Sequence, residues 1–155
     1  MKILKARSAE VSDLPRINLL IELAVMNWPM ANGMKRRAVP VLQYDEIDLK
    51  FLEVHVATIR GEIVGVAAWD ATLSESLPNG QGGLFHGLYV LPLIQGQGVG
   101  ETLMEAVFED ARIREVSGLL IKAQRVSKGY FSHQGIPALA SNDGEYPWQY
   151  WKALA

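Results

Sequence analysis

Residues 90–103, VLPLIQGQGVGETL, constrain the fold of this chain more than any other stretch. A strand-like apolar run meets a proline, three glycines follow at every second position, and a helical pattern begins. The free N–H groups and the dipole of a helix start favour an anion, and glycine lets that anion approach the main chain. The stretch therefore predicts a strand, an anion-binding loop and a helix in direct succession.

Two common phosphate-binding loops do not fit these residues. A P-loop ends in Gly-Lys-Ser/Thr, and this loop contains no lysine. A dinucleotide-binding fingerprint would start at Gly96 and Gly98, but it would find Glu101 in place of its third glycine. The acid that such a fingerprint needs about twenty residues later is also missing, because that strand ends in IKAQR with Lys122 and Arg125.

Hydrophobic periodicity gives the order of the remaining elements. Helical spacing predicts helices over 13–26, capped by Ser12, and over 98–113, whereas residues 27–47 keep no single period and predict a short helix and loops. Residues 74–83 are rich in Ser, Pro, Asn and Gly and predict a loop. Strands are expected at 3–7, 51–59, 63–73, 84–91 and 118–123, followed by a short helix and two final strands joined by the SNDGE turn.

This order predicts an α+β fold in one domain, residues 1–155. The hairpin of 51–59 with 63–73 is antiparallel, and a strand–helix–strand unit brings 84–91 and 118–123 into parallel pairing. The sheet is therefore expected to be mixed and mostly antiparallel, with helices on both faces. The expected core faces include Leu14, Ile17, Leu20, Ile21, Ala24 and Val25 in the first helix, and Val99, Leu103, Met104, Val107, Phe108 and Ala111 in the later one.

Composition excludes several classes of protein. The 155 residues are 49% hydrophobic and 21% charged, with a formal net charge of −2, so neither a nucleic-acid nor a membrane partner is indicated. Without cysteine there is no disulfide, thiolate metal site or cysteine nucleophile, and no metal is expected. No apolar run approaches the roughly 20 residues that span a bilayer, and the first residues do not form a signal peptide. The expected location is cytoplasmic.

The glycine loop resembles the Gln/Arg-x-x-Gly-x-Gly/Ala signature of the GNAT superfamily, the acetyl-CoA-dependent N-acetyltransferases. Gln95, Gly98 and Gly100 occupy the signature positions, and the preceding YVLPLIQ is similar to the usual strand end. KARSAEVSDLPRI resembles the first strand and helix start of the family. GYFSHQGI resembles its late element, with Phe131, Gly135 and Ile136 in the matching places.

The resemblance implies a splayed cleft between the fourth and fifth strands, 84–91 and 118–123, in which acetyl-CoA lies as co-substrate. The pantetheine arm is expected beside Leu88–Val90, with the pyrophosphate on the amides of residues 97–101; the Glu101 carboxylate must then point away from the phosphates. The alternative is a glycine-rich connection that merely packs tightly. The cofactor-binding residues implied are Leu88, Tyr89, Val90, Gln95, Gly96, Gln97, Gly98, Val99, Gly100, Glu101, Gln124 and Phe131.

The catalytic groups depart from the pattern of the family, which often places a carboxylate near residue 84 and a tyrosine at position 131. Leu84 and Phe131 stand there, so the candidates are His86 as general base and Tyr130 as acid for the thiolate. Both have structural alternatives, a histidine satisfied by a neighbouring carbonyl and a packing aromatic. Glu53 and His55 could point toward the cleft or outward as a solvated pair, and the outward position is expected.

The acceptor site is the least determined part. Residues 27–47, the 73–83 loop and the final hairpin would frame it, although aromatic residues of this kind more often lie in a core or a dimer interface. The predicted function is transfer of an acetyl group to a primary amine of a small molecule; a protein (lysine or N-terminal) acetyltransferase or a non-catalytic acyl-CoA-binding module stays open, as does a homodimer. The candidate wall comprises Trp28, Tyr44, Asp45, Glu46, Trp148 and Trp151.

Overall fold

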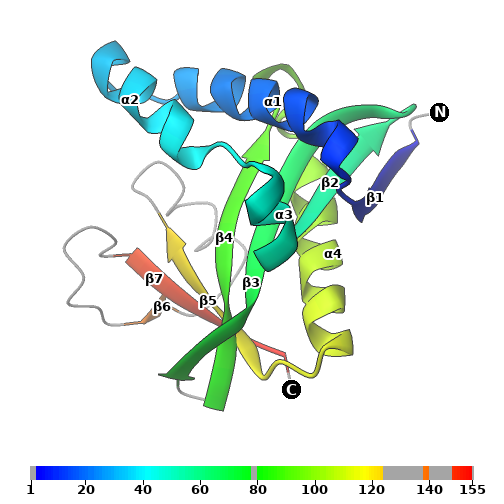
Figure 1. Cartoon of the computed structure of the whole chain (residues 1–155), viewed down its shortest axis with the longest axis vertical. Coiled ribbons are helices and arrows are strands. Elements are labelled where there is room, and N and C mark those ends of the chain that lie inside the picture. Colours follow the sequence, from blue (N-terminus) through cyan, green and yellow to red (C-terminus); the bar gives the residue numbers. More distant parts are fainter. Residues whose placement is uncertain (1–2, 78–79, 124–137, 140–147, 155) are drawn as a thin grey trace. The chain divides into compact units, whose positions relative to one another are not determined.

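A computed structural model describes residues 3–77, 80–123, 138–139 and 148–154 (Figure 1). Its helices are α1 (Leu14–Met26), α2 (Asn32–Leu42), α3 (Glu46–Phe51) and α4 (Val99–Ile113), with short 3-10 turns at Val11–Asp13 and Pro92–Ile94. Its strands are β1 (Leu4–Ser8), β2 (Glu53–Ile59), β3 (Glu62–Leu77), β4 (Gly80–Val90), β5 (Gly118–Ala123), β6 (Ala138–Leu139) and β7 (Trp148–Ala153).

The strands form one mixed sheet in the order β1-β2-β3-β4-β5-β7-β6. β1 pairs with β2, and β7 with β5 and β6, in antiparallel ladders. β4 and β5 are parallel, with Gly83 opposite Leu119 and Phe85 opposite Ile121, because α4 carries the chain back between them. The predicted α+β class and the parallel β4–β5 pair are therefore confirmed.

The chain divides into two compact units, and each is discontinuous in sequence. The first unit contains residues 1–68 and 87–107, and the second contains residues 69–86 and 108–155. The boundaries fall inside β3, β4 and α4, so three continuous elements run from one unit into the other. The expectation of a single domain stays a prediction.

In the first unit, helices cover both faces of the strands. The six predicted core residues of α1 are all buried, and they share a cluster with Val56 and Val66. Gly65, the neighbour of Val66, faces the opposite way toward α4, since successive residues of a strand alternate between faces. A Cβ on Gly65 would lie 2.7 Å from Val99 Cγ1 and 2.8 Å from Leu103 Cδ1. The absence of a side chain at Gly65 is thus what lets α4 pack this closely.

The second unit is organised around Trp69, whose side chain is fully buried. Its indole Nε1 donates to Asp110 Oδ2 at 3.0 Å, and Arg114 Nε donates to the other carboxylate oxygen at 3.1 Å. A Cβ on Gly83 would lie 2.9 Å from the indole ring. The ring of Trp69 therefore packs against the main chain of β4 in this unit.

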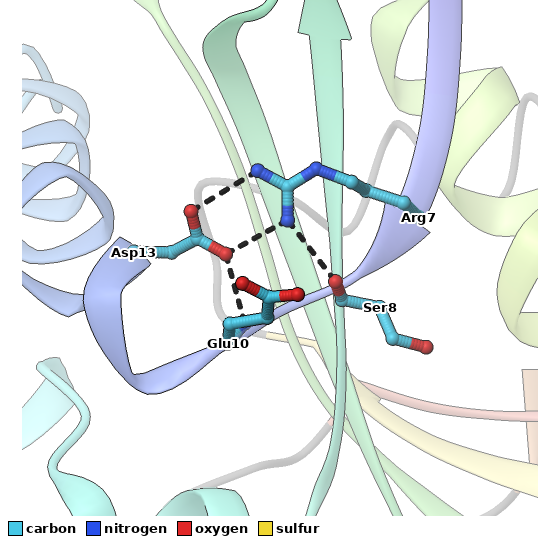
Figure 2. A network of polar contacts seen from close by, with 4 residues as sticks. All are labelled: Arg7, Ser8, Glu10 and Asp13. Carbon is cyan, nitrogen blue, oxygen red and sulfur yellow. Dashed lines mark hydrogen bonds and ion pairs between the residues drawn. The ribbon is translucent and has the colours of Figure 1, made fainter.

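The start of α1 differs from the predicted cap. Ser12 does not cap the helix; a 3-10 turn comes first, and Asp13 Oδ2 accepts the N–H of Glu10 at 2.8 Å. Figure 2 shows that the same carboxylate also accepts two hydrogen bonds from Arg7, at 2.8 and 3.0 Å. The hydrogen bonds from Arg7 hold the pKa of the Asp13 carboxyl below its usual value. This pair joins the end of β1 to the start of α1.

Residues 27–47 form more helix than their irregular pattern predicts. α2 occupies eleven residues even though it contains Pro40, and it lies beside α1 (Figure 1). The buried Lys35 ties the two helices together, because its ammonium donates to the carbonyls of Met26 at 2.8 Å and Trp28 at 3.2 Å. Polar contacts of this kind hold a helix without leaving an apolar period in the sequence.

The loop predicted at 74–83 is wrong for residues 74–77 and 80–83, which are strand. β3 continues to Leu77 and β4 begins at Gly80, so both strands are longer than the pattern indicated. Cross-strand pairing satisfies the main chain whatever the local propensity of Ser, Asn and Gly. The short helix expected after 123 and the SNDGE turn lie outside the described residues. Within the described part of the chain, no helix is both long and apolar enough to cross a membrane.

Candidate functional site

The glycine loop has the backbone conformation that its glycines predict. β4 ends at Val90, the 3-10 turn over Pro92–Ile94 redirects the chain, and α4 begins at Val99. Gly96 and Gly98 have φ angles of 82° and 85°, in the left-handed region that side chains disfavour. A Cβ at either position would meet nothing within 4 Å. Both glycines are therefore needed for the path of the chain, while the space beside them is open.

The first turn of α4, directly after these glycines, carries main-chain donors. The first intrahelical bond runs from Thr102 N to the Gly98 carbonyl at 3.0 Å, and the Thr102 hydroxyl donates to the same oxygen at 2.9 Å. The amides of Val99, Gly100 and Glu101 precede that bond, as the opening amides of any helix do. The Glu101 side chain is exposed. Amides, open space and a helix dipole together fit a phosphate group.

The end of β4 is anchored within the first unit. The Leu91 amide donates to the Val64 carbonyl at 3.0 Å, and the Tyr89 side chain is buried in the core cluster that α1 covers. Leu88 and Val90, which alternate with Tyr89, are only half-buried. The stretch expected beside the pantetheine arm is thus anchored on one face by Tyr89.

The predicted catalytic residues and the neighbouring candidates differ in exposure and in whether the structure describes them. His86 lies on β4, and its side chain is exposed. Tyr130, together with the predicted cofactor residues Gln124 and Phe131, lies outside the described residues. The outward, solvated position expected for His55 is wrong, because its side chain is buried on β2 at a position paired with Ser8.

Tyr44, predicted only as part of an aromatic wall, is fixed more firmly than that prediction implied. Its amide donates to Asn18 Oδ1 at 2.9 Å, and Asn18 Nδ2 donates to its carbonyl at 2.8 Å. Burial, with smaller effects of Tyr89 and Asp48, raises the pKa of the Tyr44 phenol well above its usual value, so the hydroxyl stays protonated. Asn18 was missed from the sequence; the signal was a poor helix former among the apolar residues of a helix.

The other residues predicted to form the wall of the acceptor site differ in burial and in the contacts that they make. Trp28 is half-buried and packs against the core cluster of the first unit, which favours the packing interpretation for that residue. Asp45 and Glu46 are exposed at the start of α3, where Asp45 caps the helix by accepting the Asp48 amide at 2.9 Å. Nothing is described for the side chains of Trp148 and Trp151 on β7.

Comparison with known proteins assigns the family. The profile of the "Acetyltransferase (GNAT) domain" matches residues 50–135, which include β4, the glycine loop and α4. The chain therefore belongs to the GNAT acetyltransferase family. An uncharacterized N-acetyltransferase of Archaeoglobus fulgidus is 40% identical over 70 residues, and this match covers 44% of the chain and 48% of the relative, about half of its length.

Solved structures agree with this fold. The PaiA N-acetyltransferase of Thermoplasma acidophilum, solved with coenzyme A, has a TM-score of 0.81 at 13% identity, over 97% of this chain and 99% of that one. A GNAT family acetyltransferase of Brucella melitensis, solved with acetyl-CoA, has a TM-score of 0.69 at 20% identity, over 99% of this chain and 89% of that one. At such low identities the likeness concerns the fold, which is the GNAT fold.

Proposed function

We propose that this protein transfers an acetyl group from acetyl-CoA to a primary amine of a small molecule. The observation that carries the proposal is the glycine loop, in which Gly96 and Gly98 have left-handed conformations with open space at their Cβ positions, directly before the first amides of α4. A diphosphate placed there would accept hydrogen bonds from these amides and gain from the helix dipole. Two structural neighbours solved with coenzyme A or acetyl-CoA support the same co-substrate.

The remainder of the co-substrate would lie along β4. A pantetheine arm that starts at the loop runs back past Val90 and Leu88, where a strand with one anchored face can offer main-chain N–H and C=O groups. The exposed Glu101 can keep its carboxylate in solvent, away from the phosphates. The thioester end of the arm would then lie toward Gly87.

The transfer requires a free amine and a leaving thiolate. The amine nitrogen attacks the thioester carbonyl carbon, the C–S bond breaks, and the nitrogen loses a proton as the amide forms. We assign acceptance of that proton to His86, directly or through a water, because its side chain is exposed on β4 and imidazole is the side chain best suited to proton transfer near neutral pH. Tyr130 is the proposed donor to the thiolate; without such a donor the thiolate leaves into solvent or takes the proton of the amine.

Two other functions compete with this proposal. A protein acetyltransferase would share the loop and differ in its acceptor, and an acyl-CoA-binding regulatory module would share the loop without turnover. The small-molecule acceptor is preferred because acidic side chains, Asp45 and Glu46, lie exposed beside the buried Tyr44, and acidic groups suit a small cationic amine.

One experiment separates the three functions. A panel of small amines, a lysine-containing peptide and a peptide with a free amino terminus are each incubated with acetyl-CoA, and released thiol is measured together with the mass of the product. Calorimetry with acetyl-CoA and CoA is run in parallel. Thiol release with small amines is the expected result. Peptide-only turnover favours the protein acetyltransferase, tight binding without turnover favours the module, and no binding rejects the co-substrate.

A further inference from the structure

We propose that two copies of this chain associate through the outer face of α1, the face that points away from the core, and that a two-fold axis relates the two copies. α1 lies wholly within the first unit. Association through this face is independent of the reaction proposed above, so neither a co-substrate nor an acceptor is needed to detect it.

The outer face of α1 carries a row of exposed apolar side chains. Pro15, Leu19 and Leu23 follow one another at four-residue spacing, which places them along one side of the helix, and we call these three residues the outer row. Leu19 is 43% exposed and Leu23 is 45% exposed. Leu19 is two residues from the fully buried Ile17 and Ile21, about 160° around the helix from each, so it points away from the core.

α1 therefore has more apolar surface than the core of the first unit requires. A surface helix of a globular protein typically has one apolar stripe and a polar opposite face. In α1 the stripe that includes Ile17 and Ile21 is buried in the core cluster, and the outer row forms a second stripe on the opposite side. Contiguous exposed apolar side chains with a polar rim mark interaction surfaces. The outer row has such a rim, because the next position at the same spacing is the exposed Asn27.

Two opposite charges flank the centre of the outer row. Arg16 and Glu22 are each three residues from Leu19, in opposite directions, so one lies on each side of the row. They are six residues apart on different sides of the helix and do not face each other within one copy. Neither forms an ion pair within the described part of the chain, and Arg16 Nη2 makes only a long hydrogen bond, to the Ile63 carbonyl at 3.5 Å. A partner that fits this face therefore carries an acidic and a basic group on either side of an apolar row.

A second copy of α1 is such a partner. The commonest packing of two helices sets their i±4 rows parallel, with the helix axes crossing at about 50°. A two-fold axis parallel to the outer row produces this geometry and exchanges the two sides of the row. Arg16 of one copy then lies beside Glu22 of the other, and the same pair forms again across the axis. A two-fold axis perpendicular to the helices would instead place both arginines on one side and both glutamates on the other.

Analytical ultracentrifugation over a concentration series tests the association. The wild type should shift from monomer to dimer as its concentration rises. Leu19→Glu brings two carboxylates together near the two-fold axis and should weaken the dimer by about 100-fold or more. Ile113→Glu is the matched control, because Ile113 is also an exposed apolar residue, at the end of α4, and the same substitution there should leave the association unchanged.

Reversal of the two charges tests the two-fold geometry. Arg16→Glu and Glu22→Arg each replace both attractive pairs by repulsive ones, so each variant alone should dimerise about 10- to 100-fold more weakly than the wild type. An equal mixture of the two variants should restore the dimer, because the glutamates of one variant then face the arginines of the other in both pairs. Glu105→Arg makes the same change at an exposed position of α4 and should dimerise like the wild type.

Three results would each overturn the proposal. A wild type that stays monomeric at every concentration does not associate through α1 or any other face. Equal dimerisation of Leu19→Glu and Ile113→Glu would place the contact away from the outer row. A mixture of the two charge variants that dimerises no better than either one alone would reject the two-fold pairing of Arg16 with Glu22. Melting temperatures verify that each variant is folded, so that a lost dimer is not a lost structure.

Discussion

Gly98 offers the sharpest test of the loop, because aspartate and asparagine are nearly the same size and differ in charge. Its φ of 85° is unfavourable for most side chains, but Asn and Asp tolerate this region best, and a Cβ there meets nothing within 4 Å. Gly98→Asn and Gly98→Asp should therefore lose a similar amount of stability, about 1 kcal/mol, from backbone strain alone. Chemical denaturation measures this loss.

Affinity for CoA should separate the two variants. A carboxylate about 5 Å from a phosphate charge, at an effective dielectric constant of about 20, is repelled by roughly 3 kcal/mol before screening. After screening in an exposed loop we expect about 1–3 kcal/mol, so Gly98→Asp should bind CoA roughly 5- to 150-fold more weakly than Gly98→Asn. Calorimetry at low and high salt should show the difference in CoA affinity between the two variants becoming smaller as the salt concentration rises. Equal affinities for the two variants would refute the placement of the diphosphate at this loop.

Three further predictions concern other parts of the molecule. Gly65→Ala should destabilise the fold by about 1–3 kcal/mol in chemical denaturation, because its Cβ would press into α4. Gly33→Ala is the control: it lies in a helix with open space around it, and the substitution should stabilise the fold by up to about 1 kcal/mol. Asp13→Asn should cost about 0.5–1 kcal/mol at neutral pH. Arg7 lowers the pKa of the Asp13 carboxyl, so the stabilisation from the Arg7–Asp13 pair is fully present above the unfolded pKa near 3.9 and is lost as the pH falls through the lower folded pKa. The unfolding free energies of wild type and Asp13→Asn, measured against pH, should therefore converge in acid. His86→Ala should lower turnover by about 100-fold or more with CoA affinity unchanged; near-normal turnover would leave His86 with a structural role only.

The parts of the fold that sequence predicted well are those governed by apolar burial. The spacing of Leu14, Ile17 and Leu20 predicts α1, and all three are fully or almost fully buried. The run Gly118–Ala123 predicts β5 with the same limits, because Leu119, Leu120 and Ile121 form an apolar run that is buried on both faces of the sheet. In both cases the removal of apolar surface from water stabilises the element, and it requires apolar residues at regular or consecutive positions that can be recognised in the sequence.

The parts that sequence missed are governed by specific polar contacts. The Lys35 ammonium of α2 reaches the carbonyls of Met26, the last residue of α1, and of Trp28, just after it. α3 begins at a capping box between Asp45 and Asp48. The Asn18 clamp on Tyr44 joins residues 26 positions apart. Each such contact needs only one donor and one acceptor, so it leaves no periodic pattern in the sequence. The residues that it joins are known only from the structure.

The glycine loop was predicted from the sequence, but the different roles of its glycines were not. The three glycines are equivalent in the sequence pattern and have different conformations in the structure. Gly96 and Gly98 hold left-handed conformations, so their identity follows from the path of the main chain. Gly100 lies inside the first turn of α4, where alanine is conformationally better than glycine. This difference explains why a Gly-x-Gly/Ala signature admits alanine at the position of Gly100 and keeps glycine at Gly98.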